Sequence, residues 1–274
     1  MAACDKPTGD ASANNTAAPA AATAAPAVTP TPSPAAPPKP AEKLRVRVLR
    51  KYPHDPGAFT QGLVFHDGTL YESTGLPGRS SLRRVDLETG RVEARVDLGY
   101  PLFGEGLALV GTELHQLTWQ DGRDLVWDMA TLKKVREHRY HGEGWGLCYD
   151  GRRLVMSDGS DQLVFRDPAT FAETGRVSVR HQGQPLRQLN ELECAAGAIY
   201  ANVWQDTVIV RIDPTTGSTT GWADASGLLT HDEIRNTDVL NGIAYVPATG
   251  HFLITGKLWP RLFEVELLPA AAKD

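Results

Sequence analysis

The segments Phe59-Thr60-Gln61-Gly62-Leu63 and Phe103-Gly104-Glu105-Gly106-Leu107 share one pattern, in which a variable residue is followed by Gly-Leu. Three further segments keep this pattern or a close variant of it. They are Glu143-Gly144-Trp145-Gly146-Leu147, Gln188-Leu189-Asn190-Glu191-Leu192 and Val239-Leu240-Asn241-Gly242-Ile243. The central residues of these segments recur every 40 to 51 residues, a period typical of one four-stranded propeller blade.

Each copy is followed by further β-strand signals. An Asp-Gly turn such as Asp67-Gly68 supplies the positive φ of a tight hairpin, and a second strand follows it, as in residues 70–72. A third strand alternates apolar and polar residues, as in 125–128, and most copies add a fourth, as in 91–96. We therefore predict an all-β fold, a five-bladed β-propeller over residues 43–269. A β-sandwich is the competing fold, but it would not explain five copies in phase.

The two ends of this region are complementary. The fifth copy ends after its third strand, at residues 262–267, while residues 44–49 form a strand with no partner ahead of the first copy. We predict that this N-terminal strand pairs with the last blade, which closes the ring and leaves no open sheet edge. A closed ring offers no edge to another copy of the chain, so we expect a monomer.

The residues before the repeats have a different composition. Residues 1–42 are dominated by Ala, Pro, Thr, Ser and Asn and hold almost no large apolar side chain, which predicts a disordered tether. Ala3 precedes Cys4 as in the tail of a bacterial lipoprotein signal, so Cys4 is a candidate for lipid attachment. We expect a periplasmic or secreted protein whose membrane contact is limited to that lipid, and a short tail at 270–274.

Charge and cysteine content exclude several classes of function. The formal net charge is -5 and no basic block is present, so nucleic acid is not an expected partner. No run of 18 apolar residues is present, and we expect no transmembrane segment. Cys148 and Cys194 lack the spacing of a zinc site, and we interpret them as small buried hydrophobic side chains.

Equivalent residues of the five copies are expected to form rings around the propeller axis, although they lie far apart in the sequence. The first ring is mostly polar and differs from copy to copy: Gln61, Glu105, Trp145, Asn190 and Asn241. The loop after the second strand gives a second ring: Gly75, Trp119, Gly159, Trp204 and Lys257. Phe59 and Phe103 stand two residues before the first two ring members. Because packing alone would favour similar apolar residues in every copy, this asymmetry indicates a small-molecule site.

From about His54 to Val265 the chain resembles the plant and bacterial type of glutaminyl-peptide cyclotransferase. Besides the repeated segments, the resemblance rests on Tyr71-Glu72-Ser73-Thr74-Gly75 and Thr255-Gly256-Lys257-Leu258-Trp259-Pro260. It implies a five-bladed propeller, unrelated to the zinc-dependent animal enzymes. The implied activity converts the N-terminal glutamine of peptides or proteins to pyroglutamate and releases ammonia. The implied pocket residues are Phe59, Gln61, Phe103, Glu105, Trp119, Trp145, Asn190, Trp204 and Lys257.

The implied reaction moves a proton from the substrate's α-amine to the departing nitrogen. Glu105, the only acidic residue of the first ring, is the predicted proton carrier, and Glu143 and Glu72 are alternatives outside the ring positions. Lys257, Gln61 and Asn190 are expected to stabilise charge on the substrate amide oxygen. The predicted substrate-binding wall is Phe59, Phe103, Trp119, Trp145 and Trp204.

We predict no catalytic metal and no cofactor, although the resemblance permits a structural calcium ion in the central channel. Two other classes of protein stay open as alternatives. One is a non-catalytic propeller that binds peptides, and the other is a metal-dependent propeller lactonase with oxygen ligands around a divalent ion. Ammonia release from a glutaminyl peptide, measured with and without a chelator, separates the three classes.

Overall fold

Strands dominate residues 40–270, the part of the chain that the computed structural model describes. The only helix in this part is the four-residue 3-10 segment η1 (Glu233–Asn236), so no described helix is long and apolar enough to cross a bilayer. The predicted all-β fold is confirmed. The predicted tether up to residue 39, with Cys4, and residues 271–274 of the predicted tail lie outside the described residues.

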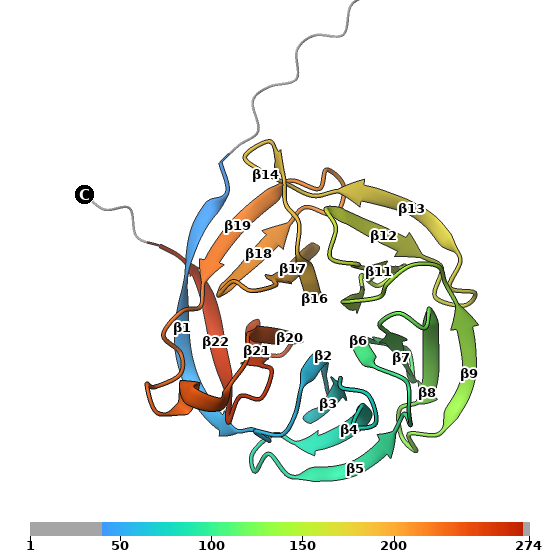
Figure 1. Ribbon diagram of the computed structural model, residues 1–274. Helices are drawn as coiled ribbons and strands as arrows, with labels where there is room; N and C mark the ends of the chain where they lie inside the picture. The colour runs from blue at the N-terminus through green and yellow to red at the C-terminus, as the bar shows by residue number, and fades with distance from the viewer. Residues whose placement is uncertain (1–39, 271–274) are drawn as a thin grey trace, which may run out of the picture. The chain divides into compact units, whose positions relative to one another are not determined.

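The strands form sheets arranged around a common centre (Figure 1), and every pair of neighbouring strands is antiparallel except β1 (Glu42–Pro53) with β19 (Thr219–Asp224). Three sheets have four strands each, in sequence order. They comprise β2 (Thr60–His66), β3 (Thr69–Thr74), β4 (Ser81–Asp86) and β5 (Val92–Asp97); β6 (Gly104–Val110), β7 (Glu113–Thr118), β8 (Arg123–Asp128) and β9 (Lys134–Arg139); and β10 (Leu147–Tyr149), β11 (Leu154–Met156), β12 (Gln162–Arg166) and β13 (Glu173–Ser178).

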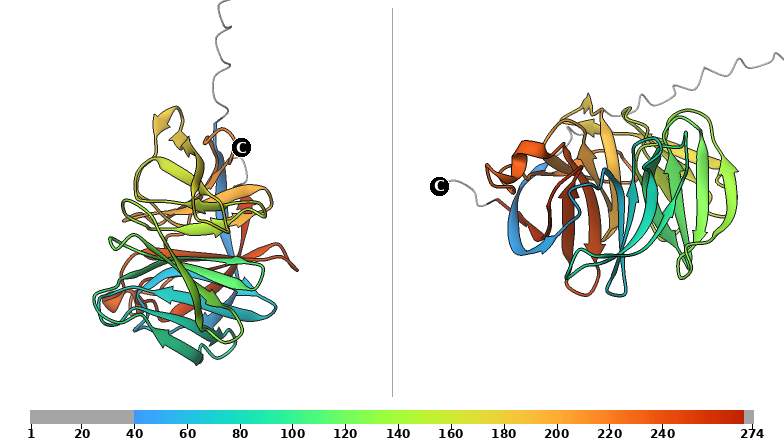
Figure 2. Two further views of the ribbon diagram at one scale, coloured as in Figure 1. Left: turned by 90° about the vertical axis from the view of Figure 1, so that its right-hand side faces the viewer. Right: turned by 60° about the horizontal axis from the view of Figure 1, so that its bottom comes forward.

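The remaining strands form one sheet of eight and a small hairpin. The eight-stranded order is β16 (Leu189–Ala195), β17 (Ala198–Val203), β18 (Val208–Ile212), β19 (Thr219–Asp224), β1 (Glu42–Pro53), β22 (Arg261–Pro269), β21 (His251–Gly256) and β20 (Leu240–Val246). The hairpin pairs β14 (Arg180–His181) with β15 (Gln184–Pro185). Figure 2 shows the sheets from two further directions, each with a clear twist.

Burial decreases from the innermost strand of a sheet to its outermost strand. The inner strand β6 is buried along most of its length, whereas no residue of the outer strand β9 is fully buried. An inner strand has protein on both faces, so its sequence does not need to alternate between apolar and polar residues. The outer strand β5 does alternate: Val92, Ala94 and Val96 are half-buried and the charged residues between them are exposed.

The glycine of the repeated motif marks a point where adjacent inner strands nearly touch. A Cβ atom on Gly62 would lie 2.5 Å from the backbone nitrogen of Leu107, which is too close for any side chain. In the fourth copy Glu191 stands at this position. Its carboxylate accepts hydrogen bonds from the backbone N–H groups of Leu63 (3.3 Å) and Ile243 (2.8 Å). Glu191 therefore connects β16 to both β2 and β20 across the centre.

The N-terminal strand joins the two ends of the described chain. β1 pairs with β22 in antiparallel register, from Leu44 opposite Pro269 to Pro53 opposite Arg261, so the predicted pairing with the last strands is confirmed. β1 also runs parallel to β19 over residues 42–45 and bridges the two halves of the eight-stranded sheet. It begins at Glu42, one residue before the predicted start of the domain.

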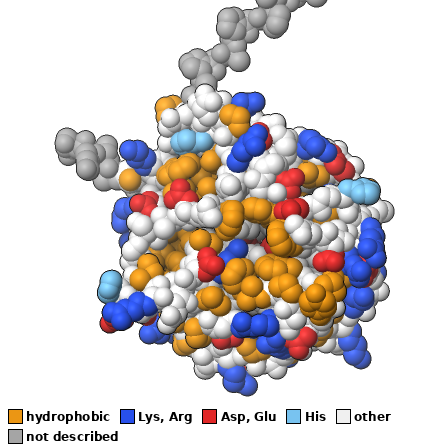
Figure 3. Space-filling model, viewed as in Figure 1, with side chains coloured by type: hydrophobic (Ala, Val, Ile, Leu, Met, Phe, Trp, Pro, Cys, Tyr) orange, Lys and Arg blue, Asp and Glu red, His pale blue; other side chains and the backbone are white. Residues whose placement is uncertain are grey.

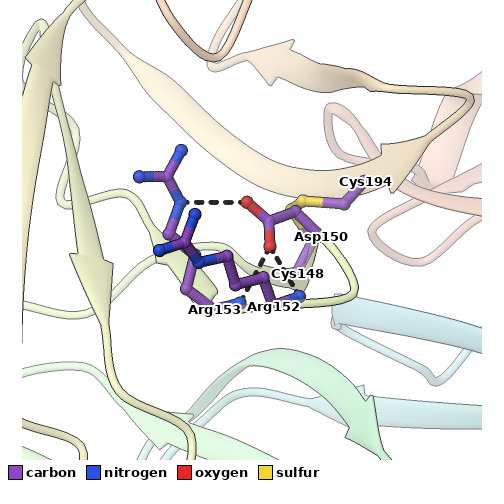
Figure 4. The surroundings of a disulfide bond; sticks show 5 residues. All are labelled: Cys148, Asp150, Arg152, Arg153 and Cys194. Carbon is purple, nitrogen blue, oxygen red and sulfur yellow. Dashed lines mark hydrogen bonds and ion pairs between the residues drawn. A yellow bond between two sulfur atoms is a disulfide. The ribbon is translucent and has the colours of Figure 1, made fainter.

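Cys148 and Cys194 form a disulfide bond, so the prediction that they are free buried side chains is wrong. Their Cα atoms lie 5.4 Å apart, although 46 residues separate them in the sequence. Figure 4 shows the bond beside the ion pair of Asp150 and Arg153, whose charged atoms are 3.0 Å apart. Cys148 belongs to β10 and Cys194 to β16. The sequence spacing of the two cysteines does not indicate a disulfide bond, because only the ring arrangement of the sheets brings their strands together.

Candidate active site

A cavity of about 420 Å³ lies among the loops at one end of the inner strands. Nine of its lining residues are the predicted pocket residues: Phe59, Gln61, Phe103, Glu105, Trp119, Trp145, Asn190, Trp204 and Lys257. Gln205, Asp238 and Val239 complete the lining. Figure 3 shows hydrophobic side chains gathered around the hollowed middle of one face, with many of the Lys and Arg side chains toward its edge.

Irregular strand pairing places the polar side chains of the cavity. In four inner strands the register of pairing shifts around the ring residue: at Gln61 in β2, at Glu105 in β6, at Asn190 in β16 and at Asn241 in β20. A β-bulge at such a shift turns a side chain out of the regular alternation of the strand. The second ring comes from residues that directly follow second strands: Trp119 after β7, Trp204 after β17 and Lys257 after β21.

Glu105 is a buried carboxyl group without a partner. The residue is 4% exposed, and it makes no hydrogen bond and no ion pair within residues 40–270. Burial raises the pKa of Glu105 well above its usual value; the charge of Lys257 opposes this shift, and the charge of Glu143 adds to it. A carboxyl group with a raised pKa can exchange a proton closer to neutral pH than an exposed glutamate can.

Lys257 is the only cation among the described residues that line the cavity. It is 4% exposed, and its Nζ lies 4.9 Å from the ring centroid of Phe59. Burial lowers the pKa of Lys257, while the charges of Glu105 and Asp238 act to raise it. Because its ammonium group forms no ion pair within the described part of the chain, its N–H donors are left for a ligand in the cavity.

Aromatic rings form the wall of the cavity. Phe59 meets Phe103 edge to face, with ring centroids 6.1 Å apart, and Phe103 lies 5.7 Å from Trp119. Trp145 meets Trp204 edge to face at 5.6 Å. Edge-to-face pairs of this kind are favourable beyond the area they bury. The result is an apolar wall that suits a short aliphatic chain.

Two amide side chains face the same space. Gln61 and Asn190 are each 3% exposed. Asn241 donates from Nδ2 to Oε1 of Gln61 (3.1 Å), so the Gln61 amide still has its two N–H donors to offer to a ligand. Oδ1 of Asn190 is buried and has no hydrogen-bond partner among the described residues. Asn241 is fully buried and does not line the cavity, so this member of the first ring supports Gln61 from behind.

The two alternative acids lie outside the cavity lining. Glu72 is 1% exposed, and its Oε1 is 3.0 Å from Nε2 of His54. Burial acts to raise the pKa of Glu72, but the charge and hydrogen bond of His54 bring it below the usual value. Glu143 accepts hydrogen bonds from the indole N–H groups of Trp119 (2.8 Å) and Trp145 (3.0 Å). Neither carboxylate lines the cavity as Glu105 does.

Three lining residues were not predicted: Gln205, Asp238 and Val239. A signal for Val239 was present, since it stands at the same place in its copy as Phe59 does in the first copy. Asp238 and Val239 exchange backbone hydrogen bonds with Lys257, each 2.9 Å long, and so flank it in space. Gln205 lies in the loop after β17, where the repeat pattern gives no guidance.

One group of described side chains could hold a metal ion. His115, Asp124 and His138 bring three ligand atoms within 4.8 Å of one another. Both histidine Nδ1 atoms lie 2.8 Å from the same Oδ2 of Asp124, a hydrogen-bonding distance, and none of the three residues lines the cavity. Among the inner strands, Glu191 accepts backbone N–H groups with both oxygens, and the charge of Glu193 lies close enough to affect its pKa. This set does not match the roughly six to eight oxygen ligands of calcium.

Comparison with known proteins shows the family to which this chain belongs. The chain matches the glutamine cyclotransferase family over residues 17–267 and belongs to this family. A glutaminyl-peptide cyclotransferase from Arabidopsis thaliana is 44% identical over 234 residues, which are 84% of this chain and 73% of the relative. The crystal structure of Myxococcus xanthus glutaminyl cyclase is similar with a TM-score of 0.77 and 46% identity, over 84% of this chain and 99% of that chain. The family resemblance of the repeated segments is thus confirmed.

Proposed function

We propose that this protein is an acyltransferase that converts the N-terminal glutamine of peptides or proteins to pyroglutamate and releases ammonia. Membership of the glutamine cyclotransferase family supports the activity, as does the 44% identical relative. One observation carries the proposal at the level of the site. A single cavity brings a buried carboxyl group, a buried ammonium group and two amides against an aromatic wall.

The reaction is intramolecular. The substrate's α-amine nitrogen attacks the carbon of its own side-chain amide, the bond from that carbon to the amide nitrogen breaks, and ammonia leaves. Holding the glutamine bent, with amine and amide carbon in contact, therefore supplies a large part of the catalysis. The indoles of Trp119, Trp145 and Trp204 line the cavity and contact the methylene groups of the substrate.

Glu105 carries the proton in this scheme. Its ionised form accepts a proton from the attacking amine, and its protonated form delivers that proton to the departing nitrogen, so the carboxyl group ends the cycle as it began. Burial supports this role, because it raises the pKa of Glu105 toward the range in which both forms are populated. Lys257, Gln61 and Asn190 donate hydrogen bonds to the amide oxygen as negative charge develops on it.

Replacement of Glu105 by Gln tests the proton carrier. Ammonia release from a glutaminyl dipeptide should fall about 10²- to 10⁴-fold, the usual contribution of general acid–base catalysis, while thermal unfolding stays close to that of the wild type. Glu173→Gln is the matched control, because it removes an exposed carboxylate paired with Arg176 (2.6 Å). Near-normal turnover in Glu105→Gln would exclude this residue as the proton carrier.

The same assay decides between the proposed activity and the two alternatives. Activity should survive treatment with a chelator, since no step uses a metal ion. Loss of activity after chelation would favour a metal-dependent propeller. Binding of glutaminyl peptides without ammonia release would favour a non-catalytic peptide-binding propeller.

For the architecture we propose a five-bladed β-propeller that acts as a monomer. The eight-stranded sheet then counts as two blades, β16 to β19 and β20 to β22 with β1. Five in-phase copies of the inner-strand motif support this count. The pairing of β1 with both β19 and β22 supports a closed ring without an open edge. Sedimentation at micromolar protein concentration tests the monomer.

For the location we propose the periplasm or the exterior of the cell, with Cys4 as a lipid-attachment residue. The disulfide between Cys148 and Cys194 supports an oxidising compartment. Mass spectrometry of the protein isolated from membranes of its host would detect the lipid on the N-terminal fragment. An unmodified Cys4 would contradict the lipid anchor without affecting the catalytic proposal.

A further inference from the structure

The carboxylate of Glu143 connects two indoles of the cavity wall. Its Oε2 accepts the N–H of Trp119 (2.8 Å) and the N–H of Trp145 (3.0 Å), and its Oε1 accepts Nε2 of Gln120 (3.0 Å). Trp119 follows β7 of the second sheet, and Trp145 precedes β10 of the third sheet. One side chain therefore holds together parts of the wall that come from different sheets.

These indoles need such an anchor. Trp119 is 37% exposed, so burial alone does not select one orientation of its ring. An indole has a single hydrogen-bonding group, the N–H donor, and a carboxylate oxygen with two lone pairs can accept two such donors at once. The orientation of each indole also affects a neighbouring ring of the cavity wall, because Trp119 contacts Phe103 and Trp145 contacts Trp204.

We propose that Glu143 is a positioning residue for glutaminyl substrates, which fixes the two indoles and thereby sets the shape of the cavity around the glutamine side chain. The inference rests on the proposed function of the cavity. Glu143 does not line the cavity, so it acts on the substrate through the indoles.

The charge of Glu143 has a second effect, on the proton carrier. Four charged or titratable groups interact with Glu105 or with its neighbour Lys257. The charge of Lys257 lowers the pKa of Glu105, and the charge of Glu143 raises it. The charge of Glu105 in turn raises the pKa of Tyr140, and the charge of Asp238 acts on Lys257. Partial burial acts to raise the pKa of Glu143, but hydrogen bonds from Gln120 and the two indoles bring it below its usual value. Glu143 therefore stays ionised over the pH range in which Glu105 titrates.

Replacement of Glu143 by Leu provides the test. Leucine keeps roughly the volume but has no acceptor atom, so it cannot hold either indole N–H. We expect the KM for a glutaminyl dipeptide to rise about tenfold with a smaller change in kcat, as for a modest misplacement of the wall. The acidic limb of the kcat/KM profile should move to lower pH, because Glu105 loses a neighbouring negative charge.

Two further variants separate the effects. Glu143→Asp keeps the charge but draws the carboxylate back, so the acidic limb should stay in place while KM still rises. Glu173→Gln removes an exposed carboxylate elsewhere and should change neither quantity. An unchanged KM and an unmoved acidic limb in Glu143→Leu would overturn the proposal. A purely structural role would lower the melting temperature without moving that limb.

A readout without substrate distinguishes failure of this inference from failure of the proposed function. Acrylamide should quench the tryptophan fluorescence of Glu143→Leu more strongly than that of the wild type, because the indoles lose their shared acceptor. If the wild type releases no ammonia, the proposed function fails, and the quenching experiment still decides whether Glu143 holds the indoles. Equal quenching in both proteins would show that it does not.

Discussion

Glu105, Glu191 and Glu193 are carboxyl groups held near the centre of the ring, and their surroundings favour the protonated form. Burial raises the pKa of Glu193 to about 8, and burial together with the charge of Glu193 raises that of Glu191 well above its usual value. In the unfolded chain each of them titrates near 4.5. Between these values these groups bind more protons in the folded state than in the unfolded state, so their contribution to stability decreases as pH rises.

This difference predicts that the free energy of unfolding is greater at pH 5 than at pH 8. The upper end of this pH range is set by the pKa of Glu193, which is about 8. Glu193→Gln should weaken the dependence, because glutamine does not titrate. Urea unfolding at several pH values measures the effect. A wild-type stability that rises steadily from pH 5 to pH 8 would contradict it, and an exposed-site variant such as Glu173→Gln should leave the slope unchanged.

At the scale of the strands, close approach explains the repeated glycine. Gly62 of β2 lies against the backbone of Leu107 in β6, the inner strand of the next sheet. A side chain there would force the two strands apart, and the ring residues Gln61 and Glu105 would move with them. Strand spacing at the centre of the ring and geometry of the cavity thus depend on the same position.

Gly62→Ala should therefore destabilise the protein by about 1–3 kcal/mol, since its Cβ would meet backbone rather than a flexible side chain. It should also lower kcat/KM through displacement of Gln61 and Glu105. Gly57→Ala is the control, because the nearest atom to its Cβ is the mobile carboxylate oxygen of Asp55 at 3.2 Å. Equal melting temperatures for the two variants would refute the close-approach argument.

At the scale of the whole molecule, the disulfide crosslinks two neighbouring sheets through their inner strands. It closes a loop of 46 residues in the unfolded chain, and loop-closure entropy of that size corresponds to roughly 4 kcal/mol at most. A double Cys148→Ser, Cys194→Ser variant should lose about 2–4 kcal/mol, which lowers the melting temperature by several degrees. Calorimetry of the oxidised, reduced and doubly substituted proteins measures the loss, and identical curves would show that the crosslink adds nothing.

Most of the cavity could be predicted from the sequence because its residues occupy equivalent places in a repeat. Trp119 and Trp204 follow the second strand of their copies at the same offset, and the ring geometry then brings them together. The disulfide and the contacts of Glu191 could not be predicted in this way. Both depend on which strands become neighbours across the centre, and Glu191 replaces a glycine that the other copies keep. Such departures from the repeat carry no pattern of their own.

The pairing of β1 with β22 has a consequence for the order in which the protein can fold during synthesis. The ribosome makes β1 early and its partner only after about 200 further residues, so a growing chain cannot complete the circle. Lys257, which lines the cavity, emerges shortly before that partner strand. The lining of the cavity is therefore incomplete until β21 and Lys257 have been synthesised.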